Sequence, residues 1–371
     1  MRHNANNDIT HVEVEPLTDS LRACYGKSYF LEEHKALELQ REGVIKVVDK
    51  EYLEQSDSFV DIMQQHADIN SRREFKRLGR KPRIAWVQDQ SNLGGAELSN
   101  LHTIKIGLDC GFDIVVITPN KFNKNTLASS DIVVLNNIFE FEREQFNDIF
   151  DVLFFQAKPF IKYDHDLREL NRLNVTRKVF EHSLINVFIS PAHYKAYEDV
   201  YGKRLADRAL VLPLAINTSI FFHDSGVIRK ANTAVIPTFV KGVEGHMAYI
   251  RNHPEIEFTA LRANWRFEEK NVHKIGHASL DHMAKLYRQH EYMVHLPTAR
   301  GAGERVYFEA MLCGCKPIVN ENVSHQSWKD YSAEDSGNEF KNIGELSEWL
   351  TNAPYKFWRE VDAQARYRCI F

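Results

Sequence analysis

The stretch of residues 295–320 constrains the fold more than any other part of this 371-residue chain. An apolar run over residues 292–296 ends at a proline, as a buried strand does, and a Gly-Ala-Gly loop follows at residues 301–303. Residues 304–313 then have helical spacing, and a glycine and a proline end that helix before a second apolar run begins. The stretch therefore predicts a strand, a loop, a helix and a further strand, which is the unit of a parallel α/β sheet.

A glycine loop that opens a helix is suited to bind an anion. The N–H groups of Gly301, Ala302 and Gly303 can approach a phosphate closely, and the N-terminus of the helix adds about half a unit of positive charge. Glu309 lies in the second turn, where its carboxylate can accept hydrogen bonds from ribose hydroxyls. The alternative is an ordinary strand–helix–strand unit with Glu309 on a solvated face, since such loops are common in α/β proteins.

Composition excludes several classes of protein. The chain has 47 basic and 51 acidic residues, so it lacks the basic excess of a dedicated nucleic-acid binder. No apolar run approaches the roughly 20 residues that are needed to span a bilayer. The first fifteen residues lack the apolar core of a signal peptide, and we expect a cytoplasmic location without a transmembrane segment.

The cysteines and histidines form no metal-binding pattern. The five cysteines are scattered, and the spacing of Cys313 and Cys315 is too short for a usual zinc pair. The 17 histidines include no HExxH motif, and His273 and His277 do not share a helical face. We therefore expect small buried thiols in a reducing cytosol and no bound metal.

Residues 1–80 differ from the rest of the chain and predict an α-rich N-terminal extension. An amphipathic helix is expected over residues 29–43, a short strand over residues 44–48 and a second helix over residues 52–69. The basic run of residues 71–80 is typical of a solvated linker helix. The alternative for this run is contact with an anionic acceptor or a membrane surface.

Strands and helices alternate after the extension, which predicts two α/β domains over residues 81–215 and 216–350 and a last helix within residues 351–371. The expected strands of the first domain are residues 83–87, 114–117, 132–135, 152–155 and 187–189. Those of the second domain are residues 234–236, 258–261, 273–276 and 292–296.

The first of these strands runs into two adjacent glycines, Gly94 and Gly95. Without a Cβ atom in the way, the backbone there can lie against a phosphate or a sugar. In a parallel sheet this turn lies at the carboxyl edge, where ligands bind. We therefore predict a donor-side or acceptor-side role for the pair, with a simple turn as the alternative.

The residues after the glycine loop also resemble a known family. The run Phe-Glu-Ala-Met-Leu-Cys-Gly-Cys-Lys-Pro-Ile-Val at residues 308–319 is similar to the donor-site signature of the group-1 glycosyltransferases. These are retaining, nucleotide-sugar-dependent enzymes of GT-B fold, and their signature has two glutamates eight positions apart. Glu309 matches the second glutamate, while Gly301 stands where the first is expected. The nearest acid is Glu304, which is our candidate catalytic residue.

Further matches follow in the order that the family shows. Gly-Gly-Ala-Glu at residues 94–97 resembles its first turn, residues 187–190 its strand ending in serine, and residues 211–221 its interdomain segment. Lys241 and Gly242 resemble a Lys-Gly pair whose lysine holds the donor diphosphate. The resemblance does not cover the N-terminal extension.

Two departures from the family pattern stand out. Family members often carry a histidine at the end of the fourth strand, near the reacting sugar, where residues 155–158 here read Phe-Gln-Ala-Lys. Lys158 is the candidate substitute, because His165 lies farther along the chain. An arginine that usually precedes the Lys-Gly pair is also missing, and Arg262 or Arg266 would have to compensate.

The resemblance implies two Rossmann-like domains that face each other across a cleft, with a nucleoside-diphosphate sugar mainly on the second. Glu309 would bind the ribose, and Lys241 with the N–H groups of residues 301–304 would neutralise the diphosphate. Gly94 and Gly95 of the first domain would contact the donor from the other side of the cleft. The resemblance also implies retention of anomeric configuration, no metal and no cofactor besides the sugar donor as co-substrate. In this fold the last helix often crosses back to the first domain.

One tripeptide points to a different chemistry. Asp164-His165-Asp166 has the Asp-x-Asp spacing that binds a divalent ion in the other main glycosyltransferase fold. We expect it on a solvated helical face of the first domain, away from the donor.

Two other functions remain open. A non-catalytic GT-B protein that binds a nucleotide sugar or glycan would explain the missing glutamate, histidine and arginine. A nucleotide-sugar epimerase of the same fold would release free sugar. A glycan is the commonest acceptor in the family, and modified DNA is the alternative, since some bacteriophage glucosyltransferases share the fold and residues 72–80 are basic.

Overall fold

The computed structural model describes most of the chain after residue 80 and three short strands before it. The described ranges are residues 11–16, 29–32, 45–47, 81–89, 95–171, 173–202, 205, 208–263, 267–276, 278–328 and 342–367. The three early strands, β1 (His11–Pro16), β2 (Tyr29–Glu32) and β3 (Ile45–Val47), pair antiparallel in the order β2-β1-β3.

The first domain is built on a six-stranded parallel sheet with the order β5-β4-β6-β7-β8-β9. Its strands are β4 (Arg83–Val87), β5 (Asp113–Ile117), β6 (Ile132–Leu135), β7 (Phe160–Tyr163), β8 (Asn186–Phe188) and β9 (Ala209–Val211). Its helices are α4 (Gly95–Asp109), α5 (Lys124–Ser129), α6 (Arg143–Phe150), α7 (Leu173–His182) and α8 (Pro191–Tyr201). The β4–β6 and β4–β5 pairs are parallel. The Val and Ile side chains of β4 and β6 are buried, as in the interior of a parallel sheet, whereas those of the edge strand β5 are mostly half-buried.

The second domain is built on a five-stranded parallel sheet with the order β12-β11-β10-β13-β14. Its strands are β10 (Lys230–Ile236), β11 (Glu257–Leu261), β12 (Val272–Ile275), β13 (His290–His295) and β14 (Lys316–Val319). Its helices are α9 (Val243–Asn252), α10 (Leu280–Gln289) and α11 (Arg305–Leu312). Gly314 has a φ of 75° directly after α11, which explains why a glycine ends this helix.

Each sheet has one point at which the strand order reverses. In the first sheet the chain turns back between β4 and β6, and in the second between β10 and β13. Ligands of open α/β sheets bind outside the carboxyl ends of the strands at such a switch point. The fold therefore predicts one ligand-binding edge in each domain.

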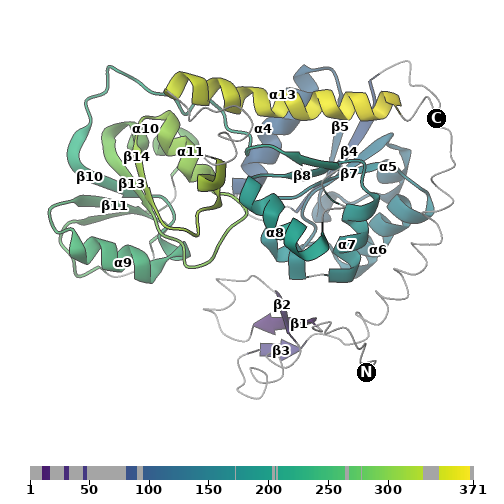
Figure 1. The fold of residues 1–371 in the computed structure, drawn as a ribbon, viewed down its shortest axis with the longest axis horizontal. Coiled ribbons are helices and arrows are strands. Elements are labelled where there is room, and N and C mark those ends of the chain that lie inside the picture. Colours follow the sequence, from purple (N-terminus) through teal and green to yellow (C-terminus); the bar gives the residue numbers. More distant parts are fainter. Residues whose placement is uncertain are drawn as a thin grey trace.

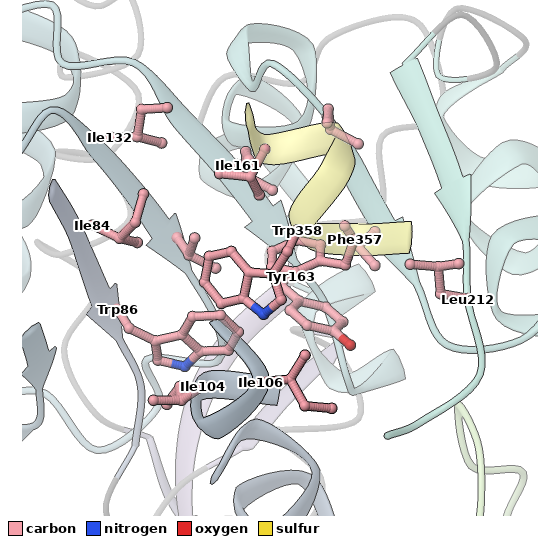
Figure 2. Close-up of a cluster of buried hydrophobic side chains, with 14 of the residues drawn as sticks. Ile84, Trp86, Ile104, Ile106, Ile132, Ile161, Tyr163, Leu212, Phe357 and Trp358 are labelled. Atoms are coloured by element: carbon pink, nitrogen blue, oxygen red, sulfur yellow. The ribbon is translucent and has the colours of Figure 1, made fainter. Parts of the chain in front are cut away.

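The last helix, α13 (Ile343–Tyr367), contacts both domains, and Figure 1 shows it lying across them in yellow. Leu346 and Leu350 are part of the apolar core of the second domain. Phe357 and Trp358 enter the core of the first domain beside Trp86, as Figure 2 shows. The Trp358 indole N–H donates to a backbone carbonyl of α4, Thr103 O, at 2.7 Å. Burial of these aromatic rings fixes the helix across both units.

Most of the strands and helices expected from the sequence after residue 80 are confirmed, but one strand is wrong. Residues 152–155 are not a strand, because Asp151–Phe155 continue α6 as a π-helical segment. The fourth strand of the sheet is β7, eight residues farther along. A four-residue apolar run does not distinguish a strand from a buried helical turn, which explains the error.

In the N-terminal extension, the strand expected near residue 45 is confirmed as β3, but the expected helix is wrong at its start. Tyr29–Glu32 form β2, so the extension is not α-rich in its described residues. The expectations for residues 52–69 and 71–80 lie outside the described residues. Among the helices that the structure describes, none has both the length and the apolarity to cross a membrane.

Candidate functional site

Two loops meet at the switch point of the second sheet. One follows β10 and contains the 3-10 helix Phe239–Lys241 and Gly242, and the other follows β13. The Lys241 carbonyl accepts from the N–H and the hydroxyl of Thr298, at 3.0 and 3.1 Å. A Cβ atom at Gly242 would lie 1.9 Å from the Leu296 carbonyl oxygen, so this close approach of the two backbones requires glycine.

The carbonyl groups of the glycine loop are held from both sides. The Ser324 hydroxyl donates to the Gly301 carbonyl within the second domain. The Ser190 hydroxyl, at the N-terminus of α8 in the first domain, donates to the Ala302 carbonyl at 2.6 Å. The Ala302 side chain is buried in the core of the first domain. The loop is therefore fixed by contacts with both domains.

Most N–H groups of the loop are free to bind a ligand, but that of Gly301, which the sequence predicted as a phosphate donor, donates to the Asn322 carbonyl at 3.4 Å. Within the described ranges, the N–H groups of Ala302, Gly303 and Glu304 make no hydrogen bond. A Cβ atom at Gly303 would lie 2.2 Å from Cε1 of the buried His325. The three N–H groups precede α11, so they form the kind of anion site that the sequence predicts.

The Glu304 side chain folds back against Gly301. A Cβ atom built on Gly301 would lie 2.2 Å from Glu304 Oε1, so the carboxylate fills the space of a side chain at position 301. Glu304 is 5% exposed, and its Oε2 atom has no hydrogen-bond partner in the described part of the chain. Burial raises the pKa of Glu304, an effect that the Lys241 ammonium opposes and the Asp166 carboxylate reinforces. Glu304 is therefore close to charged groups of both domains.

Glu309 is buried beside an arginine that the sequence reasoning did not single out. Arg305 Nε donates to Glu309 Oε1 at 2.9 Å, one turn apart on α11. The Arg305 guanidinium also donates to Ser99 of α4 and to the Ala215 carbonyl. The alternative that Glu309 lies on a solvated face is thus wrong, since it is 5% exposed.

The carboxyl end of β7 brings a histidine to the edge of the first sheet. His165 Nε2 lies 2.9 Å from Asn100 Oδ1 of α4, and its ring stacks on Tyr163 at 4.7 Å. Burial lowers the pKa of His165 to about 3, so the ring is neutral at physiological pH. The Arg305 charge from the second domain acts in the same direction. His165, which we set aside in favour of Lys158, thus lies at the end of the fourth strand, where the family often carries a histidine.

The expectation of a solvated Asp164-His165-Asp166 helix is wrong. Asp164 is fully buried after β7, with Lys162 Nζ 3.6 Å and His193 Nε2 3.1 Å from its carboxylate oxygens. Burial alone would raise the pKa of Asp164, but these two partners hold it at about 2. The partners are protein side chains, and no group of three His, Cys, Asp or Glu in the described ranges is arranged to hold a metal ion.

The remaining sequence candidates lie in different places. Lys158 precedes β7 and donates to the Ser130 carbonyl at 2.7 Å, at the amino edge of the sheet and away from the other candidates. Gly95 begins α4 and is exposed, with the Arg305 side chain near it. Gly94 and Arg266 lie outside the described residues, and Arg262 is exposed after β11.

Comparison with known proteins identifies the fold. No family model and no curated protein matches the sequence. HepE from Anabaena, solved with UDP-glucose, is 14% identical, covers 78% of this chain and 93% of its own, and has a TM-score of 0.51. A glycosyltransferase from Rickettsia africae is 13% identical, covers 79% of this chain and 94% of its own, and has a TM-score of 0.53. The chain thus has the fold of the GT-B glycosyltransferases, as the sequence resemblance predicts.

Proposed function

We propose that this protein transfers a sugar from a nucleoside-diphosphate sugar to a hydroxyl group of an acceptor. The observation that carries the proposal is the position of the Glu304 carboxylate. It fills the space beside Gly301, where the signature of the family has its first glutamate, and Glu309 stands at the second. Both acids are buried at the switch point of the second sheet, where a nucleotide ligand is expected.

Lys241 and the glycine loop would stabilise the leaving group. As the glycosidic bond breaks, the departing diphosphate gains negative charge, and fixed positive groups lower the energy of that state. Lys241 lies on the loop whose backbone is bonded to Thr298, close in sequence to the glycine loop, and its positive charge lowers the pKa of His295 and opposes the rise in the pKa of Glu304. The unpaired N–H groups of Ala302 and Gly303 would bind the phosphate oxygens. This service needs no metal ion.

Glu304 and His165 would act on the transferred sugar from opposite domains. The raised pKa of Glu304 and its unpartnered Oε2 suit a hydrogen bond to a sugar hydroxyl. His165 is neutral, and its Nδ1 atom has no partner in the described residues, so it is available to a second hydroxyl. Retention of anomeric configuration belongs to the same proposal and is checked by the NMR coupling constant of the product.

The acceptor that we propose is a glycan. The net charge of −4 favours a neutral acceptor over DNA, because phosphate contacts need a basic surface. UDP-glucose is the first donor to test, since HepE, of the same fold, was solved with it. Salt-dependent binding of DNA would instead support the modified-DNA acceptor.

A panel of nucleoside-diphosphate sugars tests the proposal. Wild type and Glu309→Ala are incubated with each sugar, binding is followed by thermal shift, and nucleoside-diphosphate release by a coupled assay. We expect one donor to stabilise the wild type, not the variant, and to turn over. Stabilisation without release, even with candidate acceptors, would favour the binding-only alternative. No response to any donor would contradict both.

A further inference from the structure

Arg305 connects three parts of the molecule through one buried side chain. Its Nη1 atom donates to the Ser99 hydroxyl at 2.9 Å and to the Ala215 carbonyl at 2.8 Å, and its Nε atom donates to Glu309 at 2.9 Å. Ser99 belongs to α4 of the first domain, and Ala215 lies between the last strand of the first sheet and the first strand of the second. Arg305 itself is 6% exposed.

A buried arginine is costly unless its donors are satisfied. Three of the five donors of Arg305 are satisfied, by groups of both domains and of the segment between them, so its guanidinium is fixed where the domains meet. The planar fork of a guanidinium sets the direction of each bond, unlike a lysine ammonium. The Glu309 carboxylate is therefore oriented by contacts that reach the first domain, although it lies on the second.

We propose that Arg305 is a positioning residue, which orients Glu309 for the nucleoside of the donor and makes that orientation depend on the contact between the domains. This inference rests on the proposed function. Only one Glu309 oxygen is engaged by Arg305, and the other makes no hydrogen bond within the described ranges. A carboxylate held by one oxygen presents the second in a fixed direction, as ribose recognition requires.

The competing account is that Arg305 itself binds the diphosphate, in place of the arginine that is missing before Lys241. Two features favour positioning. Three of the five N–H donors of Arg305 are already engaged, and its charge is paired with Glu309. The two accounts differ in which part of the nucleotide loses affinity when Arg305 is changed.

Isothermal titration calorimetry with uridine, UMP and UDP separates the two accounts. If the donor panel identifies another base, the corresponding nucleoside, monophosphate and diphosphate are used. We expect Arg305→Lys to weaken all three ligands by the same factor, about tenfold, which is the scale of a lost hydrogen bond to a charged group. Glu309→Gln should have a similar effect, and the double variant should lose no more than either single variant. A loss that grows with each added phosphate would overturn the inference, as would additive losses.

Ser99→Ala is the matched variant that keeps the Arg305–Glu309 pair and removes only the anchor in the first domain. We expect about a threefold loss, equal for the three ligands, because one of the three bonds that orient the guanidinium is gone. Unchanged affinity in this variant would overturn the link to the domain contact, even if the Arg305 variants failed to fold. Wild type that binds none of the nucleotides would instead refute the proposed function.

Discussion

The glycines at the two ligand-binding edges are required for different reasons. In the second domain, Cβ atoms at Gly242, Gly301 and Gly303 would lie 1.9, 2.2 and 2.2 Å from atoms of the same domain. In the first domain, a Cβ atom at Gly95 would lie 3.4 Å from the Arg305 side chain, which is an ordinary contact. Gly242 thus needs to be glycine because a backbone carbonyl lies against it, and the space beside Gly301 and Gly303 is filled by the side chains of Glu304 and His325, whereas the turn of the first domain has space beside it.

This contrast shows how the two edges divide the work. The second edge is a closely packed site whose geometry is set before any ligand arrives, which is what electrostatic stabilisation of a leaving group needs. The first edge contributes single side chains: Ser190 donates to the Ala302 carbonyl, and His165 is held by Asn100 at the carboxyl end of its strand.

The largest effect that we expect is acid destabilisation of the second domain. Burial lowers the pKa of His246 to about 4 and those of His295 and His325 to about 3. These pKa values are below the value of about 6.5 for a histidine in the unfolded chain, so below that pH the unfolded state binds more protons than the folded state and is favoured. With three such groups, the free energy of unfolding should fall by up to roughly 4 kcal/mol per pH unit between about pH 6 and pH 4.

Urea denaturation at pH 7, 6 and 5 measures the free energy of unfolding, and hydrogen exchange of backbone amides at the same pH values shows which domain opens first. The second domain should lose protection first, because it has three histidines whose pKa is lowered to about 3 or 4, whereas in the described part of the first domain the pKa of His165 is lowered to about 3 and that of His102 is lowered by partial burial. Replacing His295 by Gln is expected to reduce the pH dependence by about one proton. Stability that stays constant down to pH 5 would contradict the account of the buried imidazoles.

Gly242→Ala should destabilise the second domain by about 3 kcal/mol or more, because the new methyl group would meet a backbone carbonyl that cannot move independently. Gly95→Ala is the matched control in the first domain and should change the melting temperature by only a few degrees. Thermal unfolding of both variants checks the contrast directly. Equal melting temperatures for the two variants would show that Gly242 is no more closely packed than Gly95.

Glu304→Gln is expected to lower kcat about a hundredfold while nucleoside-diphosphate affinity stays within about twofold, since Glu304 would contact the sugar and not the nucleotide. Steady-state kinetics and titration calorimetry measure the two quantities. The double variant Gly301→Glu, Glu304→Gly should recover part of the loss, because the new side chain would start where the Glu304 carboxylate now lies and would return a carboxylate to the same loop. Full activity in Glu304→Gln would show that the retained carboxylate has no role.

The smallest effect is expected for Lys158→Met. Lys158 lies at the amino edge of the first sheet, so its loss should leave kcat within about twofold and cost about 1 kcal/mol of stability through its bond to the Ser130 carbonyl. His165→Asn, at the carboxyl edge, should lower kcat by about tenfold or more. The opposite ranking of these two variants would mean that the reacting sugar does not lie where we propose.

The alternation of strands and helices was predictable from the sequence because apolar runs and glycines mark it. The second-domain loops were also predictable, since Gly301, Gly303 and Lys241 follow recognisable strands. The order of the strands in each sheet was not, because parallel strands pair over long distances in sequence.

Charged residues in buried positions account for the main error at the candidate site. Lys162 lies inside β7 and is fully buried, so the strand did not read as apolar, whereas the helical residues 152–155 did. That shift of the fourth strand led us to Lys158 and away from His165. Arg305 was missed for a related reason, because its partners Ser99 and Ala215 are distant in sequence and only the fold brings them together.

Hydrogen–deuterium exchange with and without the nucleoside diphosphate that the donor panel identifies tests whether the donor binds at the switch point of the second sheet. We predict slower exchange at residues 302–304, whose free N–H groups the ligand would engage. Slower exchange is also expected at residues 238–243 and 297–301, because a bound ligand would stabilise the two loops that flank the switch point of the second sheet. A smaller change is expected at the first edge, near residue 95. Protection confined to the first domain, with no change in the glycine loop, would contradict the placement of the donor on the second.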